Sequence, residues 1–168
     1  MKVYLNSIGC RLNHSEIETM AKQLLTAGHQ IVEDAAEADK VIINTCAVTS
    51  EAARDARSLT RRIHRQNDAA EILLTGCYAT IAPEELGRVE GASQIVVNKD
   101  KDTLVQLLDP SIKTEELVFD KEPLLREFHA GTMSHTRAFI KVQDGCNNKC
   151  TFCVTTIARG EGQSRHLG

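Results

Sequence analysis

An α/β fold, in which a mainly parallel sheet carries helices on both faces, is predicted by the order of patterns along this sequence. Short apolar runs typical of buried strands alternate with stretches that repeat apolar residues at helical spacing, as βαβ units do. The chain of 168 residues is 42% apolar and 26% charged, which is ordinary for a globular domain. This length allows one domain, or one domain and the start of another.

The chain opens with a predicted strand and a predicted helix. Residues 2–8 form the strand. Ser15 and Glu18 make a capping box that would begin the helix, and Gly28 would end it. Between them, apolar residues recur at helical spacing: Ile17, Met20, Ala21, Leu24 and Leu25.

Further strands and helices alternate after this pair. Strands are expected at residues 40–45 (KVIINT), 71–75 (EILLT) and 94–97. Helices are expected from about Ser50 to Gln66, from Pro83, and around Leu104, Leu107 and Leu108. We therefore expect a sheet domain over residues 1–112, a connector over 113–134, and the start of a second domain over 135–168. A strand at 137–142 would open that second domain.

Composition and charge narrow the class of protein. The net charge of −3 gives no global attraction to nucleic acid, so any RNA affinity would need a local basic face. No stretch reaches the roughly 18 apolar residues of a membrane span, and the N-terminus does not resemble a secretion signal. We expect a cytoplasmic protein, in which the six cysteines favour metal binding or catalysis over disulfides.

Cys146, Cys150 and Cys153 form a C-x3-C-x2-C motif. Three thiolates at this spacing can hold three irons of a [4Fe–4S] cluster, which leaves the fourth iron open to a small molecule. This arrangement is the one that binds and reductively cleaves S-adenosylmethionine. A structural zinc site would need a fourth ligand nearby, and the nearest downstream candidate, His166, has no usual finger spacing.

The other three cysteines, Cys10, Cys46 and Cys77, each lie at or just past the end of a predicted strand. Because the carboxyl ends of parallel strands share one edge, we expect these thiols to converge there and to be able to hold a second iron–sulfur cluster. The alternative is that each is a small buried apolar residue.

A stripe of arginines runs along the helix after Cys46: Arg54, Arg57, Arg61 and Arg65. It lies nearly opposite the apolar face of that helix. The stripe is either a solvated surface or a ridge that tracks RNA phosphates beside the cluster edge, and the sequence leaves both open.

Four segments together resemble the radical S-adenosylmethionine methylthiotransferases. They are residues 7–16 (SIGCRLNHSE), 43–49 (INTCAVT), 74–79 (LTGCYA) and 141–153 (KVQDGCNNKCTFC). The first two resemble the MtaB-type branch most. The resemblance implies a three-layer methylthiotransferase N-terminal domain, followed by the first strand and cluster loop of a radical S-adenosylmethionine β/α barrel.

The resemblance also implies an activity: methylthiolation of N6-threonylcarbamoyladenosine at adenine C2 in the tRNA anticodon loop. The cofactors would be S-adenosylmethionine and two [4Fe–4S] clusters, one on each set of three cysteines. Electrons would come from a reductant protein such as a flavodoxin or ferredoxin. Since the pattern stops after one barrel strand, we expect a truncated or fragmentary sequence that cannot turn over alone.

Other readings remain open at this point. A sister branch would act on isopentenyladenosine in tRNA or on an aspartate of a ribosomal protein. A non-catalytic iron–sulfur or zinc-binding module would use the same thiols as a scaffold. A nucleotide-binding α/β domain is weaker, because no glycine fingerprint follows the first strand.

Overall fold

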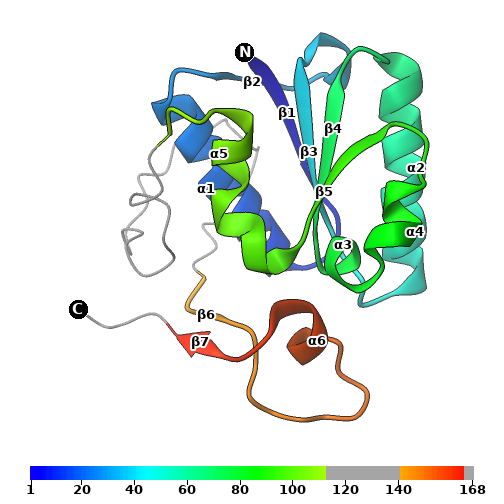
Figure 1. Ribbon diagram of the computed structural model, residues 1–168, viewed down its shortest axis with the longest axis vertical. Coiled ribbons are helices and arrows are strands. Elements are labelled where there is room, and N and C mark those ends of the chain that lie inside the picture. Colours follow the sequence, from blue (N-terminus) through cyan, green and yellow to red (C-terminus); the bar gives the residue numbers. More distant parts are fainter. Residues whose placement is uncertain (113–140, 165–168) are drawn as a thin grey trace.

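The computed structural model describes residues 1–112 and 141–164 (Figure 1). Its centre is a five-stranded sheet in the order β2-β1-β3-β4-β5, and every pairing in it is parallel. The strands are β1 (Lys2–Ser7), β2 (Gln30–Val32), β3 (Lys40–Thr45), β4 (Glu71–Gly76) and β5 (Ala92–Val96). The predicted parallel α/β sheet is confirmed.

Helices cover both faces of this sheet. Figure 1 shows α1 (Arg11–Thr26) and α5 (Leu104–Leu108) on one side, and α2 (Ser50–Gln66) and α4 (Pro83–Gly87) on the other. The short helix α3 (Cys77–Ile81) directly follows β4, and two 3-10 turns complete the domain, η1 (Ala35–Glu37) and η2 (Asn98–Thr103). No helix in the described parts of the chain is long and apolar enough to cross a membrane.

Two hydrophobic cores explain why the strands are apolar throughout. Ile42 of β3 packs with Ile17 and Leu24 of α1. Its neighbours Val41 and Ile43 point to the other face and pack against α2. A parallel sheet buried on both faces has this continuous apolar pattern rather than an alternating one.

The helix predicted at 50–66 has the predicted bounds, and it is capped by Thr49, whose hydroxyl accepts from the Ala52 amide at 3.1 Å. The helix expected from Pro83 is also present. Among the strands and α-helices of the sheet domain, two short elements were not predicted, β2 and α3. The three residues of β2 are too few to display a period, and α3 begins at the residue after β4 with no turn signal between them.

The predicted capping box at Ser15 is wrong. Helix α1 begins at Arg11 with Cys10 as its N-cap residue, so Ser15 and Glu16 are buried inside the helix. The end of the helix is as predicted, because Gly28 has a positive φ of 83° and the His29 amide bonds to the Leu24 carbonyl at 2.9 Å. Leu25 and Leu107, both expected on apolar faces, are exposed.

Residues 141–164 form a small separate unit below the sheet in Figure 1. Strand β6 (Gln143–Asp144) pairs antiparallel with β7 (Gln163–Ser164), and helix α6 (Thr155–Arg159) lies between them. The connector expected at 113–134 and most of the strand expected at 137–142 lie outside the described residues; Lys141 and Val142 are not in a strand. That residues 135–168 begin a β/α barrel stays a prediction.

Candidate functional site

Cys46 and Cys77 are neighbours at the carboxyl edge of the sheet. Thr45 of β3 is in register with Gly76 of β4, and each cysteine is the next residue along its chain. β1 lies on the other side of β3, where the Ile8 amide donates to the Asn44 carbonyl at 2.9 Å. The three strands that precede Cys10, Cys46 and Cys77 are thus adjacent, and their carboxyl ends share one edge of the sheet as predicted.

Gly9 brings the loop that carries Cys10 directly against Cys46. Its φ is +108°, and a Cβ placed on it would lie 2.3 Å from Cys46 Cβ and 2.7 Å from Cys46 Sγ. Any side chain at position 9 would therefore collide with this cysteine, besides the strain of a positive φ. The close approach of the two loops depends on glycine here.

Each sulfur of this edge has a polar neighbour. The Val48 amide donates to Cys46 Sγ at 3.5 Å, and Asn98 Nδ2 donates to Cys77 Sγ at 3.8 Å. Cys10 is exposed, and its thiol points to Asn13 Oδ1 at 3.7 Å. Amide donors to sulfur stabilise thiolates and tune iron–sulfur centres.

Cys146, Cys150 and Cys153 lie in the loop between β6 and α6. The Cys146 amide donates to the Gly160 carbonyl at 3.2 Å, and its sulfur accepts from the Asn148 amide at 3.4 Å. Hydrogen bonds from the hydroxyl and the amide of Thr155 lower the pKa of the Cys153 thiol, which favours the thiolate that a metal binds.

Gly145 precedes this loop, with a φ of +66°. A Cβ on it would lie 2.1 Å from the Glu161 carbonyl oxygen, so glycine lets the loop pack against the backbone between α6 and β7.

The six cysteines are not gathered as ligands of a single ion. All six are free thiols. Within residues 1–112 and 141–164, no three Cys, His, Asp or Glu side chains gather closely enough to hold a metal ion. A single ion needs its ligands around a common point, whereas each thiolate that holds an iron–sulfur cubane binds its own iron.

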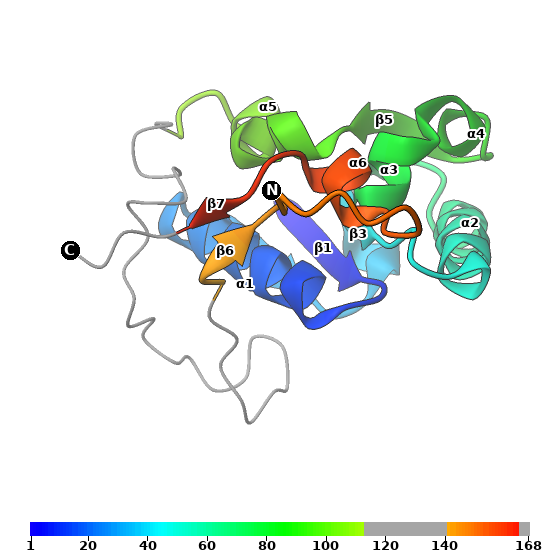
Figure 2. The ribbon, with the colours of Figure 1, turned by 90° about the horizontal axis from the view of Figure 1, so that it is seen from below.

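The structure brings both sets of cysteines to one side of the molecule. In Figure 2, α6 lies beside α3, which begins at Cys77. Asn98 links them, because its Nδ2 donates both to the Ala158 carbonyl at 2.6 Å and to Cys77 Sγ. The loop with the second set of cysteines therefore directly precedes a helix docked on the edge that carries the first set.

A buried ion network, which the sequence did not predict, lies beneath α6. We call it the Glu16 network, and its charged members come from distant parts of the chain: Glu16, Lys101, Lys141, Asp144 and Arg159. Burial on its own raises the pKa of Glu16, but Lys101, Arg159 and Lys141 outweigh it and hold that pKa well below its ordinary value of 4.5. Glu16 is thus ionised although it is buried.

Sequence signals for this network were weak. Asn13 and Glu16 lie inside the first motif segment, and Arg159 begins an Arg-Gly pair, but nothing marks Lys101. Asn44 lies two residues before Cys46 and connects β3 to α1. Its Nδ2 donates to the Asn13 carbonyl at 3.1 Å and to the Glu16 carboxylate at 2.9 Å.

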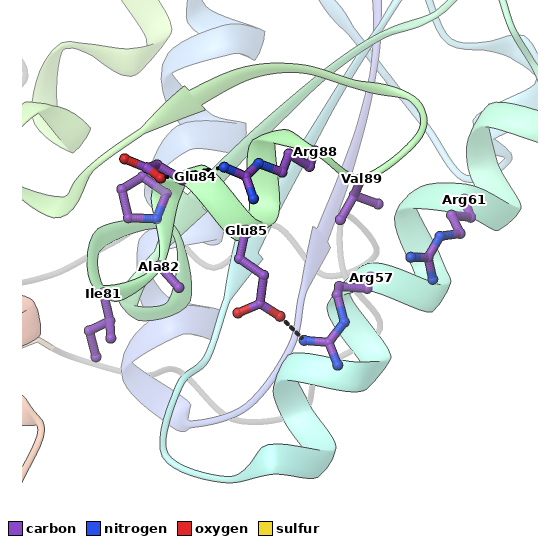
Figure 3. A pocket seen from close by; sticks show the side chains of 9 residues that line it. Arg57, Arg61, Ile81, Ala82, Glu84, Glu85, Arg88 and Val89 are labelled. Carbon is purple, nitrogen blue, oxygen red and sulfur yellow. Dashed lines mark hydrogen bonds and ion pairs between the residues drawn. The ribbon is translucent and has the colours of Figure 1, made fainter.

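The four arginines of the α2 stripe do not share one environment. Arg57 is half-buried and pairs with Glu85 of α4 at 3.0 Å (Figure 3). It also lies over the Tyr78 ring, 5.7 Å from its centroid. Arg54, Arg61 and Arg65 are exposed. Arg57 and Arg61 line one wall of an open pocket of about 730 Å³ between α2 and α4, whose other charged residues are Glu84, Glu85 and Arg88.

Comparison with known proteins gives consistent matches. The chain is 32% identical to the threonylcarbamoyladenosine tRNA methylthiotransferase MtaB of Aquifex aeolicus over 99% of this chain and 42% of that protein. It is 37% identical to MtaB of Chlamydia pneumoniae over 94% of this chain and 36% of that protein. It is also 31% identical to the tRNA-2-methylthio-N(6)-dimethylallyladenosine synthase of Chloroherpeton thalassium, over 99% of this chain and 38% of that protein.

The chain thus spans about two fifths of the length of these curated relatives, and they confirm the resemblance carried by the four motif segments. The model of the uncharacterized protein family UPF0004 matches residues 2–98, which hold the whole sheet together with Cys10, Cys46 and Cys77. With more than half of its length matched by that model, the chain belongs to the UPF0004 family.

Proposed function

We propose that this chain supplies the cysteine ligands of an enzyme that methylthiolates adenine C2 of N6-threonylcarbamoyladenosine in the anticodon loop of tRNA. The observation that carries the proposal is the pair of three-cysteine sets on one side of the molecule. Two [4Fe–4S] clusters and S-adenosylmethionine would supply the radical chemistry that an unactivated C–H bond requires.

The protein side chains have separate tasks in this proposal. Cys146, Cys150 and Cys153 would hold the cluster that binds S-adenosylmethionine, and Cys10, Cys46 and Cys77 would hold the other one. Gly9 keeps the Cys10 loop close to Cys46. The Val48 amide would donate to the sulfur of Cys46.

The choice of substrate rests on the relatives. Two of those described above are named as acting on threonylcarbamoyladenosine in tRNA and one as making the methylthio-dimethylallyl nucleoside. We favour the first because of the residues around Cys10 and Cys46, and keep the isopentenyladenosine branch as the second candidate. The target base lies in a loop, where it can be turned outward for chemistry.

Partners and location follow from the same chemistry. We propose that the exposed Arg54, Arg61 and Arg65 contact tRNA phosphates, with Arg57 holding α2 against α4 through Glu85. A flavodoxin or ferredoxin would supply electrons. Six free thiols fit the reducing environment of the cytoplasm.

Anaerobic reconstitution with iron and sulfide tests the cluster assignment. Two [4Fe–4S] clusters predict about eight irons per chain, and Cys146→Ala and Cys46→Ala should each lose about half. Phe152→Ala changes an exposed side chain between Cys150 and Cys153 and should keep all the iron. One tightly held zinc, with no visible absorbance, would instead support the non-catalytic module.

Mass spectrometry of tRNA nucleosides tests the substrate. Deletion of the gene should remove the 2-methylthio group from threonylcarbamoyladenosine and leave that of isopentenyladenosine. Loss of the second nucleoside instead would assign the protein to the sister branch, and loss of neither would reject tRNA as the substrate.

A further inference from the structure

The Glu16 carboxylate is a meeting point for four segments of the chain. Its side chain on α1 is only 4% exposed. It accepts from Lys101 Nζ at 2.7 Å, from Lys141 Nζ at 3.2 Å and from Arg159 Nη1 at 2.8 Å, besides Asn44 Nδ2. Two of these cations, Lys141 and Arg159, belong to the unit that carries Cys146, Cys150 and Cys153.

Arg159 joins that unit to the sheet domain most directly. Its side chain is 4% exposed at the end of α6. Nη1 donates to Glu16 and to Asp144 of β6, each at 2.8 Å, and Nη2 donates to Asn13 Oδ1 at 2.8 Å. One guanidinium thus binds α1 and also holds its own unit together.

Asn13 carries this connection to the first set of cysteines. Its Nδ2 donates to the carbonyls of Ile8, two residues before Cys10, and of Thr45, directly before Cys46. Its Oδ1 faces both Arg159 and Cys10 Sγ. Arg159 is therefore connected through Asn13 to Cys10 and to the residue before Cys46.

On its other side, α6 is connected to the second set. The Cys146 amide bonds to the Gly160 carbonyl, the residue after Arg159, and the Thr156 hydroxyl donates to the Asn148 carbonyl at 3.1 Å. The loop is thereby tied to α6 at two points, so that docking of α6 also sets where the loop lies.

We propose that the Glu16 network is a positioning device that fixes the spacing between the two cysteine sets, with Arg159 as its central residue. The network joins three cations to Glu16, so removal of Glu16 would take from Lys101, Lys141 and Arg159 a buried carboxylate that each of them contacts. Breaking a buried pair in this way is strongly destabilising, because the remaining charge has lost its partner. The role given to the spacing between the two cysteine sets rests on the proposed function. The docking of α6 on the sheet domain does not depend on that function.

Hydrogen exchange of the 168-residue chain, prepared without iron, tests the docking. In Glu16→Gln and in Arg159→Gln, the amides of Ala158 and Gly160, which are bonded within α6, should exchange about tenfold faster or more. The amides of β3 should change much less. Glu51→Gln is the matched control, because it makes the same change at an exposed position.

Thiol labelling of the same iron-free chains gives a second reading. Cys77 is buried and linked to α6 through Asn98, so maleimide should label it about tenfold faster once α6 is released. Cys46, enclosed by Gly9, should keep its rate.

Each possible outcome either supports or refutes the positioning role of the Glu16 network. Faster exchange confined to residues 141–164, with faster labelling of Cys77, supports the positioning role. Equal acceleration in β3 and α6 would show that the network only stabilises the fold, and unchanged exchange in both variants would show that it does not hold α6. Because no iron is present, a failure of the cluster assignment would leave this result unaffected. Arg159→Gln covers the case in which Glu16→Gln does not fold, since it leaves Lys101 and Asn44 on Glu16.

Discussion

Gly9→Ala perturbs the point at which two cysteine loops meet. The new methyl group would lie 2.3 Å from Cys46 Cβ, far inside van der Waals contact, in a residue whose φ is +108°. The strained backbone costs about 1–3 kcal/mol. The overpacking costs about 1–3 kcal/mol more, because Cys46 or the loop must move.

Gly28→Ala separates these two effects. Gly28 also has a positive φ, of 83°, but a Cβ on it would meet nothing within 4 Å. This control carries the backbone strain alone, about 1–3 kcal/mol. Gly9→Ala should therefore lower the free energy of unfolding by about 1–3 kcal/mol more than Gly28→Ala does, as the overpacking alone predicts.

Urea denaturation of both variants measures that difference. With a slope of about 1–3 kcal/mol per molar urea, it amounts to a shift of the midpoint of about 1 M. If the proposed function also holds, Gly9→Ala should bind about four irons instead of eight, since only one cluster edge is disturbed. Equal midpoints for the two variants would refute the close approach of Gly9 to Cys46.

Two further predictions concern buried polar groups. The Thr45 hydroxyl donates to the Thr75 carbonyl at 2.5 Å and accepts from the Ala79 amide at 3.3 Å, so Thr45→Val should lower the free energy of unfolding by about 1–3 kcal/mol. Thr26→Val, which loses an exposed hydroxyl bond, is the control, and an equal effect of both on the urea midpoint would contradict the reasoning. Since the folded-state pKa of Glu16 is held below its ordinary 4.5, its stabilisation is complete above pH 4.5 and is lost as the pH falls below that value. The free energy of unfolding should therefore decline more steeply with falling pH in the wild type than in Glu16→Gln, measured from pH 7 to pH 3, and parallel curves would contradict an ionised Glu16.

Local patterns were enough to predict most of the sheet domain. The strands at 40–45 and 71–76 are apolar runs flanked by polar residues, and α2 shows its apolar face and its start in its own sequence. The local pattern failed where its residues also make tertiary contacts. Ser15 and Glu18 resemble a capping box, but the N-cap of α1 is Cys10, so Ser15 and Glu16 lie buried within the helix, where Glu16 binds distant cations.

For the candidate site, too, local sequence predicted one part and missed another. Cys10, Cys46 and Cys77 could be predicted to share an edge, since each follows a strand that is recognisable by itself and parallel strands end together. Nothing local indicated that residues 141–164 dock on that edge. The contact joins Glu16 to Arg159, which are 143 residues apart. The residues next to each of them in the sequence do not indicate that its charged side chain is buried.

By itself, then, the sequence determined the family, the parallel sheet and the two sets of three cysteines. Each of these depends on short motifs or on the periodic spacing of apolar residues within one element. Only the tertiary structure decided how the two sets of cysteines lie relative to each other. That arrangement depends on buried charges from α1, η2, β6 and α6, and a buried ion is stable only where its partners come together in the folded chain.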